Sequence, residues 1–394
     1  MDSASIRSDF PILEDLIYLD SASTSLTPEP VLQSVLDYYR GYRANVGRGV
    51  YRLAQLADQR YRDAHRKVAS FVGGEEGTLV FTRNATESIN IVARGLQWKR
   101  GDKVVTTLLE HHSNLLPWMR LKKEGVQLKL LEPDNHGRIG LSDFEKAVDD
   151  DTKFVAVSQL SNALGTLLPI KEIARIAHDH DAALLVDGAQ SVPHSAVNVK
   201  DIDCDFLCFS GHKMLGPTGT GALWMKNAEE IEPLMVGGGM VEDVCDYDYD
   251  IKKGYEGFEA GTPDISGCIG FGAAADYLTR VGMQEIHDHE RQLTRRLLAG
   301  LAEIEGVEVY GPPDPEDRGG VISFNVRGLM PHEVALMLDQ ASNIMVRSGH
   351  HCCIPLMRHL GLKYGTVRAS LYLYNTEEEI DKLLGALEQI AKMA

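Results

Sequence analysis

Cysteine is scarce in this chain, and its spacing excludes two kinds of cysteine-rich protein. The sequence has 394 residues and only six cysteines, too few for a disulfide framework in a chain of this length. No two Cys-x-x-Cys pairs occur, as a structural zinc site would require. We therefore expect reduced thiols and no metal site, so a cysteine with a special role must be identified from its neighbours.

Long apolar runs and basic stripes are missing as well. No stretch approaches the roughly 18 apolar residues of a membrane helix, and the first residues, MDSASIRSDFPILEDL, lack the basic and apolar segments of a secretion signal. The 40 Lys and Arg residues are outnumbered by 57 Asp and Glu residues, and basic clusters such as 60–67 are diluted by neighbouring acidic residues. A nucleic-acid binder needs a continuous basic stripe. We expect a cytoplasmic protein that binds neither membranes nor nucleic acids.

Between residues 78 and 226 the sequence alternates short β-branched runs with helical patterns. This rhythm is typical of βαβ units and predicts an α/β fold with a mostly parallel sheet covered on both faces. Thr86 is the expected cap of a helix, and a second helix over 170–180 has its apolar residues on one face. The expected strands are 78–82, 103–107, 127–131, 154–160, 183–189, 206–211 and 222–226.

The pattern changes after the glycine-rich stretch 236–240 and the polar segment 242–257, which we expect to be a loop. Long helices are expected near 264–280 and 283–304, and a smaller α+β unit follows. Its last helix opens with Thr376 and Glu379, which are spaced as a capping box. The sequence thus predicts a large domain over 15–280 and a small C-terminal domain over 281–394, and residues 1–14 are a candidate to pack on the small domain.

The most informative string is CFSGHKMLGPTGTG, residues 208–221, in which an expected strand ends in Ser-Gly-His-Lys. A lysine at a strand terminus among small residues can lie buried beside a ligand, which lowers its pKa and makes it a Schiff-base nucleophile. Lys213 is the candidate. A surface lysine after a turn is the alternative, and it is the commoner one for an isolated Ser-x-x-Lys motif.

Two further strings give this lysine a context. The strand ending in LLVDGAQS places Asp187 at the C-terminal edge of the sheet, where α/β proteins bind ligands and where a carboxylate suits a pyridinium nitrogen. Gln190, three residues later, is placed to donate to a ring oxygen. TRNATES, residues 82–88, joins a strand to a helix N-terminus, which attracts phosphate.

Taken together, these strings resemble the class V aminotransferase family of pyridoxal 5'-phosphate (PLP) enzymes of fold type I, and within it the SufS-type (type II) cysteine desulfurases. The resemblance covers nearly the whole chain, and the order and spacing of its motifs fit. They are LDSASTSLTP (19–28), NVGRGV (45–50), NATESIN (84–90), EHHSNLLPW (110–118), SNALGT (161–166), VDGAQS (186–191), SGHKMLGPTGTG (210–221), FEAGTPD (258–264), VRSGHHCCIPLM (346–357) and VRASLYLYN (367–375).

The resemblance implies a PLP site in which Lys213 bonds covalently to the cofactor and Asp187 pairs with its ring nitrogen. Gln190 contacts the phenolic oxygen, His111 stacks on the ring as a further catalytic residue, and Asn162 lies near the cofactor oxygen or the substrate carboxylate. The phosphate is held by residues of the NATES and SGHK motifs and, from a partner subunit of a homodimer, by residues of FEAGTP. These phosphate ligands are Thr86, Ser210, His212, Gly261 and Thr262, and Ala85 is a further cofactor-binding residue.

In the small domain the resemblance implies the substrate and sulfur chemistry. Arg368 of VRASL is the expected clamp for an α-carboxylate, and Arg347 is a second basic group beside it. Cys352 of SGHHCC is the expected nucleophile, because adjacent histidines favour a thiolate. For Cys353 we favour packing over a role in persulfide exchange, since successive residues of an extended segment point to opposite sides.

The implied reaction converts L-cysteine to L-alanine and leaves a persulfide on Cys352, for iron–sulfur cluster or other thio-cofactor assembly. The short segment that carries Cys352 implies a dedicated sulfur-acceptor protein. Selenocysteine lyase or cysteine sulfinate desulfinase activity stays an alternative, and a transaminase is a less favoured one. Gly47 and Tyr51 replace histidines that SufS-type enzymes commonly carry, and the sequence assigns no role to Cys245.

Overall fold

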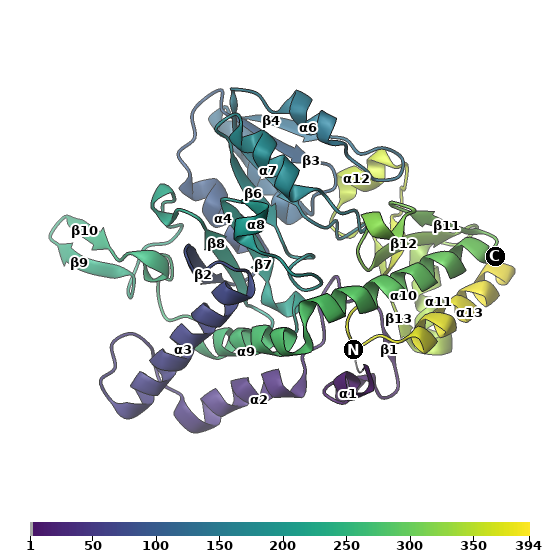
Figure 1. The fold of residues 1–394 in the computed structure, drawn as a ribbon, viewed down its shortest axis with the longest axis horizontal. Helices are drawn as coiled ribbons and strands as arrows, with labels where there is room; N and C mark the ends of the chain where they lie inside the picture. Colours follow the sequence, from purple (N-terminus) through teal and green to yellow (C-terminus); the bar gives the residue numbers. More distant parts are fainter. Residues whose placement is uncertain (1–2) are drawn as a thin grey trace.

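The computed structural model describes residues 3–394 and shows a large and a small body joined by one continuous run of helices (Figure 1). The large body is built on a seven-stranded sheet in the order β2-β8-β7-β6-β5-β3-β4. All neighbouring strands are parallel except β8, which runs antiparallel to β2 and β7. The strands are β2 (Thr78–Thr82), β3 (Lys103–Thr107), β4 (Gln127–Leu131), β5 (Thr152–Ser158), β6 (Ala183–Asp187), β7 (Phe206–Ser210) and β8 (Gly221–Met225).

Helices cover both faces of this sheet, because its central strands are apolar on both sides. Alternate strand residues face two separate cores: Val104, Phe154 and Phe206 pack with α4 and α5 on one face. Val105, Val155 and Phe209 pack with α3, α6, α7 and α9 on the other. The helices are α2 (Glu29–Asp37), α3 (Arg52–Phe71), α4 (Ala85–Gly95), α5 (Leu116–Leu121), α6 (Leu141–Ala147), α7 (Ile170–His178), α8 (Val199–Ile202) and α9 (Ile265–Val281).

The small body is an antiparallel sheet in the order β11-β12-β15-β14, packed against three helices. It follows α9 after a turn at Gly282, whose φ of 95° favours glycine. The strands are β11 (Val307–Tyr310), β12 (Val321–Val326), β14 (Arg347–Gly349) and β15 (Thr366–Ser370). The three helices are α10 (Met283–Glu303), α11 (Pro331–Ser342) and α13 (Glu377–Met393), while α12 (Ile354–His359) packs Leu356 and Met357 into a core of the large body.

The N-terminal segment contacts both bodies. Strand β1 (Ile17–Tyr18) pairs in parallel with β13 (Ile344–Met345) of the small body, and the Phe10 ring packs edge-on against Tyr374 and against Tyr277 of α9. Before them, α1 (Ser3–Arg7) ends at Arg7, whose Nη1 donates to Glu379 Oε1 at 2.7 Å. The division into domains at residue 280 stays a prediction.

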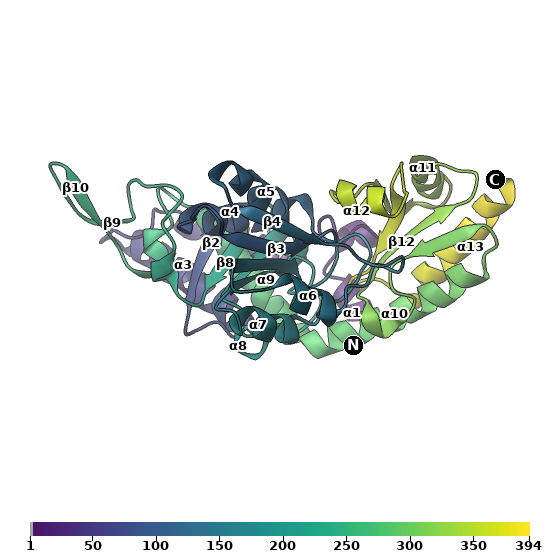
Figure 2. The same ribbon diagram turned by 90° about the horizontal axis from the view of Figure 1, so that it is seen from above.

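Most expected elements are confirmed, and two expectations are wrong. The cap of α4 is Asn84, whose side chain accepts from the Glu87 N–H at 3.1 Å, whereas Thr86 lies inside the first turn. The segment expected as a polar loop contains a hairpin of β9 (Val241–Cys245) and β10 (Asp248–Ile251). Its valine, tyrosine and isoleucine residues favour strands, and the hairpin projects away from the large body (Figure 2). Among residues 3–394, no helix combines the length and apolarity needed to span a membrane.

Candidate active site

A cavity of about 300 Å³ lies at the carboxyl ends of the parallel strands, where the two bodies meet. Ligands bind at this edge in open α/β sheets because the loops that follow the strands converge there. It is lined by the residues expected for cofactor and substrate, with the exception of Gly261 and Thr262. These lining residues are Ala85, Thr86, His111, Asn162, Asp187, Gln190, Ser210, His212, Lys213, Arg347, Cys352 and Arg368.

Lys213 and Asp187 form the charged centre of the cavity. Lys213 ends a short 3-10 helix directly after β7, and Asp187 is the last residue of the neighbouring strand β6. Burial lowers the pKa of the Lys213 amine, and Asp187 opposes that shift. Burial raises the pKa of Asp187, which is 4% exposed, while Lys213 and the Ala189 N–H act the other way. A neutral amine is therefore favoured here more than at the protein surface.

The polar groups of the cavity fit PLP. Asp187 accepts one bond, from Ala189 N at 3.0 Å, which leaves acceptor capacity for a protonated ring nitrogen. Gln190 Nε2 donates to the Ala22 carbonyl at 2.7 Å, and its second N–H remains for a phenolic oxygen. Gln190 Oε1 and Ser158 Oγ are buried without hydrogen-bond partners. Unsatisfied polar atoms in a cavity indicate a missing polar ligand or water.

The expected phosphate end of the site lies at the start of α4. Ser210 Oγ accepts from Ala85 N at 2.9 Å, so the end of β7 is joined to the first turn of α4. Thr86 Oγ1 and Ser113 Oγ lie 2.6 Å apart and both line the cavity. A helix N-terminus with adjacent hydroxyl groups suits a phosphate, since its free N–H groups and positive dipole end face the anion.

Two histidines complete this half of the cavity, and both are held neutral. Burial lowers the pKa of His111 to about 3, with Lys213 as the next cause, and His111 Nδ1 accepts from Ser113 N at 3.1 Å. Burial also lowers the pKa of His212 to about 4. A neutral imidazole suits ring stacking against a cofactor, which is the position that the sequence predicts for His111.

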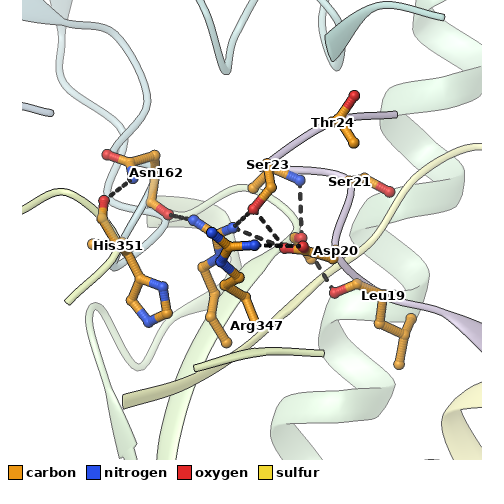
Figure 3. A network of polar contacts seen from close by, with 12 residues as sticks. Leu19, Asp20, Ser21, Ser23, Thr24, Asn162, Arg347 and His351 are labelled. Carbon is orange, nitrogen blue, oxygen red and sulfur yellow. Dashed lines mark hydrogen bonds and ion pairs between the residues drawn. The ribbon is translucent and has the colours of Figure 1, made fainter. Parts of the chain in front are cut away.

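Figure 3 shows Asp20, Ser23 and Asn162 gathered in one network of polar contacts. Arg368 lines the cavity from the small body and is already paired with the N-terminal segment. Its Nη2 donates to Asp20 Oδ1 at 3.0 Å and to Ser23 Oγ at 2.7 Å, while its buried Nε has no partner. The more exposed Arg347 approaches Asp20 Oδ2 at 3.8 Å. A substrate carboxylate at this place therefore meets two guanidinium groups and competes with Asp20 for them.

Asn162 joins this cluster to the segment that carries the two adjacent cysteines. Its carbonyl accepts from Arg368 Nη1 at 2.8 Å, and its side-chain Nδ2 donates to the His351 carbonyl at 2.8 Å. Its Oδ1 accepts from the Cys353 thiol at 3.3 Å. Cys353 is fully buried, and burial raises the pKa of its thiol, so it packs as a neutral group. Cys352, by contrast, is exposed and lines the cavity.

Gly261 and Thr262 lie outside this cavity. They line a separate hollow together with Gly47, Arg48 and Gly239, and both residues are exposed. This placement leaves them free to face another molecule. Their expected contact with a partner subunit's phosphate stays a prediction.

Reasoning from sequence missed two carboxylates that lie next to residues lining the cavity. Asp20, within the LDSAS motif, pairs with Arg368, and Glu110, the first residue of EHHSN, is fully buried. Glu110 accepts from Thr107 Oγ1 and from Asn114 Nδ2, each at 2.7 Å. Burial raises its pKa to about 7. Both residues lie in motifs that the resemblance singles out, but a carboxylate in a motif does not reveal its partner.

Comparison with known proteins agrees with this geometry. The model of the aminotransferase class-V family matches residues 17–383, and the chain belongs to that family. A probable cysteine desulfurase of Methanothermobacter thermautotrophicus is 47% identical over 100% of this chain and 99% of that relative. The cysteine desulfurase of Haloferax volcanii is 43% identical over 98% of this chain and 96% of that relative.

Solved structures agree in fold. The apo structure of a cysteine desulfurase from Thermococcus onnurineus superposes with a TM-score of 0.96 at 47% identity, covering 99% of this chain and 98% of that one. The cysteine desulfurase CsdA of Escherichia coli superposes with a TM-score of 0.91 at 30% identity, covering 100% of this chain and 99% of that one. The expected fold-type I architecture is confirmed.

Proposed function

We propose that this protein is a PLP-dependent cysteine desulfurase, which converts L-cysteine to L-alanine and keeps the sulfur as a persulfide on Cys352. The observation that carries the proposal is a single cavity lined by a half-buried lysine, a buried arginine and an exposed cysteine. A transaminase has use for the first two side chains but none for the thiol. The relatives named cysteine desulfurase support the same conclusion.

PLP, when bound, supplies the electron sink for chemistry at the substrate Cα. Lys213 would hold it covalently, Asp187 would hold its ring nitrogen, and Ser210 and Thr86 would hold its phosphate. Arg368 and Arg347 orient the substrate through its carboxylate, which aims the side chain of the substrate at Cys352. The buried Lys213 amine, with its lowered pKa, is suited to take the proton from Cα at Nζ.

Sulfur transfer is the task of Cys352. Its thiolate attacks the sulfur of the substrate, so an S–S bond forms while the bond between that sulfur and the substrate Cβ breaks. The electron pair of the broken bond stays with the carbon skeleton, which takes up a proton and leaves as alanine. The sulfur taken from the substrate stays on Cys352 as a persulfide until an acceptor removes it.

We further infer that the protein is a cytoplasmic homodimer. We also infer that it passes this sulfur to an acceptor protein, which the shortness of the segment between β14 and α12 supports. Apolar side chains exposed near Gly47 and Gly261 offer a surface for a second copy, Val50 and Tyr51 among them. Delivery to iron–sulfur clusters belongs to this proposal. Its test is whether cysteine turnover rises when a candidate acceptor protein is added.

The desulfurase activity is tested with Cys352→Ser in PLP-supplemented protein. We expect the variant to keep the visible absorbance of bound cofactor but to lose alanine and sulfide production from L-cysteine with a reductant, because no thiol remains in the cavity to take the sulfur. Cys245→Ser is the matched control, since Cys245 is the other exposed cysteine of the described residues. We expect the control to form alanine and sulfide in equal amounts at the rate of the wild type.

Three outcomes would contradict the proposal. If the wild type shows cofactor absorbance but forms no sulfide from L-cysteine, the substrate would instead be selenocysteine or cysteine sulfinate, or the reaction would be transamination. Full activity of Cys352→Ser would remove the role of this thiol. A wild type that binds no PLP would remove the enzyme assignment.

A further inference from the structure

The segment that carries Cys352 has an unusual backbone. His351 and Cys352 both have positive φ angles, of 50° and 57°. Side chains with a Cβ atom rarely adopt this left-handed conformation, because Cβ approaches the backbone too closely. Two such residues in succession persist only where surrounding contacts hold them.

Contacts from the large body hold both strained residues. The carbonyl of His351 accepts from Asn162 Nδ2, and the carbonyl of Cys352 accepts from the main-chain N–H of His112, each at 2.8 Å. The main-chain N–H of Ile354 donates to the His112 ring at Nε2, at 3.2 Å. His112 therefore contacts the chain at the reactive cysteine through its backbone and two residues further on through its ring.

The ring of His112 also completes the start of α12. The first N–H groups of a helix have no partner within the helix. Cys353, the residue before α12, makes no side-chain cap bond. The imidazole of His112 supplies the acceptor that this helix lacks, and it does so from the other body of the protein.

We propose that His112 is a positioning residue for the sulfur chemistry, and that its ring holds the 350–354 segment so that the thiol of Cys352 stays over the cavity. The inference rests on the proposed desulfurase activity and names the residue that orients its nucleophile. The ring accepts a hydrogen bond, so it must be neutral at Nε2. Burial lowers the pKa of His112, with His350 as the second cause, which favours that neutral form.

The test compares His112→Ala with His112→Gln in a Cys245→Ser background, so that Cys352 is the one exposed thiol left among the described residues. Alanine removes the acceptor, while glutamine carries an oxygen at similar reach. His359→Ala is the matched control: His359 lies on α12 and bonds a backbone carbonyl of the large body, that of Pro133 at 2.8 Å, but is not bonded to the 350–354 segment.

For His112→Ala we expect kcat to fall about 10- to 100-fold, because the nucleophile loses its alignment, while KM for L-cysteine changes less than about threefold. We expect His112→Gln to recover most of the loss and His359→Ala to resemble the background. Hydrogen exchange of the Ile354 amide, measured without substrate in cofactor-loaded protein, should be faster in His112→Ala and near normal in His112→Gln.

Unchanged kcat and unchanged Ile354 exchange in His112→Ala would overturn the inference. Equal losses in His112→Ala, His112→Gln and His359→Ala would also overturn it, because they would show a general effect on packing. If His112→Ala does not fold, His112→Met replaces it, since methionine keeps the bulk of the side chain but is a poor acceptor. A wild type that forms no alanine would defeat the proposed function instead, and the exchange measurement would still test the contact.

Discussion

Asp187 and Glu110 are two almost completely buried carboxyl groups near the proposed cofactor site, and they have different partners. Asp187 faces Lys213, and this positive charge limits the rise of its pKa. Glu110 accepts hydrogen bonds from the neutral groups of Thr107 and Asn114, and burial raises its pKa to about 7. The charge of Glu110 therefore changes near neutral pH, one residue away from His111.

Because Glu110 titrates near neutral pH, we predict that the stability of the protein depends on pH in this range. The pKa of Glu110 is 4.5 for an ordinary glutamate and about 7 in the native protein, so between these values the native state binds more protons than the unfolded chain. Raising the pH through this interval therefore costs stability, and at about 1.4 kcal/mol per pKa unit the total is roughly 3 kcal/mol. Glu110→Gln cannot titrate, so its thermal midpoint should rise relative to that of the wild type between about pH 5 and about pH 8.

Thermal unfolding followed by circular dichroism at several pH values measures this difference. Glu305→Gln is the control, because Glu305 is an exposed glutamate and its replacement should leave the pH dependence unchanged. Parallel pH profiles for the wild type and Glu110→Gln would show that Glu110 does not titrate in this range.

At the scale of elements, sequence reasoning succeeds where one residue pattern favours one structure. The runs at 78–82, 103–107 and 127–131 are strands with those limits, because β-branched and aliphatic residues lie between turn signals. The cap of α4 was assigned wrongly because Asn84 and Thr86 are both good cap residues, and their order in the helix depends on where the backbone turns. The β9–β10 hairpin was missed because its many aspartates hide the strand pattern.

The candidate site shows the same division. Lys213 and Asp187 could be placed in the cavity because strand ends fix where they lie. Arg368 lies in the middle of β15 and was found through the VRASL motif of the resemblance. The partners of Arg368 could not be predicted, since Asp20 is 348 positions away and only the folded chain brings the two together. The hydrogen bond from the Ile354 N–H to the His112 ring could not be predicted either, since it also joins residues that are far apart in the sequence.

The capping box of α13 gives a prediction at this scale. Thr376 accepts from the Glu379 N–H, and Glu379 Oε2 accepts from the Thr376 N–H at 3.1 Å. Thr376→Ala removes the first of these bonds and should cost about 1 kcal/mol, which lowers the thermal midpoint by about 1 °C for a protein of this size. Thr376→Ser keeps the hydroxyl and should stay close to the wild type. Equal midpoints for the alanine and serine variants would contradict the role of this cap.

At the scale of the whole molecule, the proposed homodimer would share its sites between subunits. Thr262 lies outside the cavity of its own chain, so a phosphate contact from this residue requires a second copy. Thr262→Asp should place a negative charge beside the phosphate of the partner and weaken PLP binding. Lys213→Ala should be inactive for a different reason, because it lacks the lysine that holds PLP.

Mixing these two inactive variants tests the arrangement. A hybrid dimer has one site that combines an intact Lys213 with an intact Thr262, and random exchange should restore about a quarter of the wild-type activity. Activity and subunit exchange are measured on the same mixture. Verified exchange without recovery would show that Thr262 acts within its own chain. Full activity of Thr262→Asp by itself would show that this residue does not act at the site.

The pairing of β1 with β13 has a consequence for the order in which the protein is made. The ribosome makes Ile17 and Asp20 well before Ile344 and Arg368, to which they pair, and Arg368 follows Asp20 by 348 positions. Contacts between segments so far apart in the chain form late, because a long loop must first be closed. The sheet of the large body has all its strands by residue 225, whereas the substrate-carboxylate end of the cavity must wait until Arg368 has been made. A nascent chain thus acquires the elements of its cofactor cradle well before it can select a substrate.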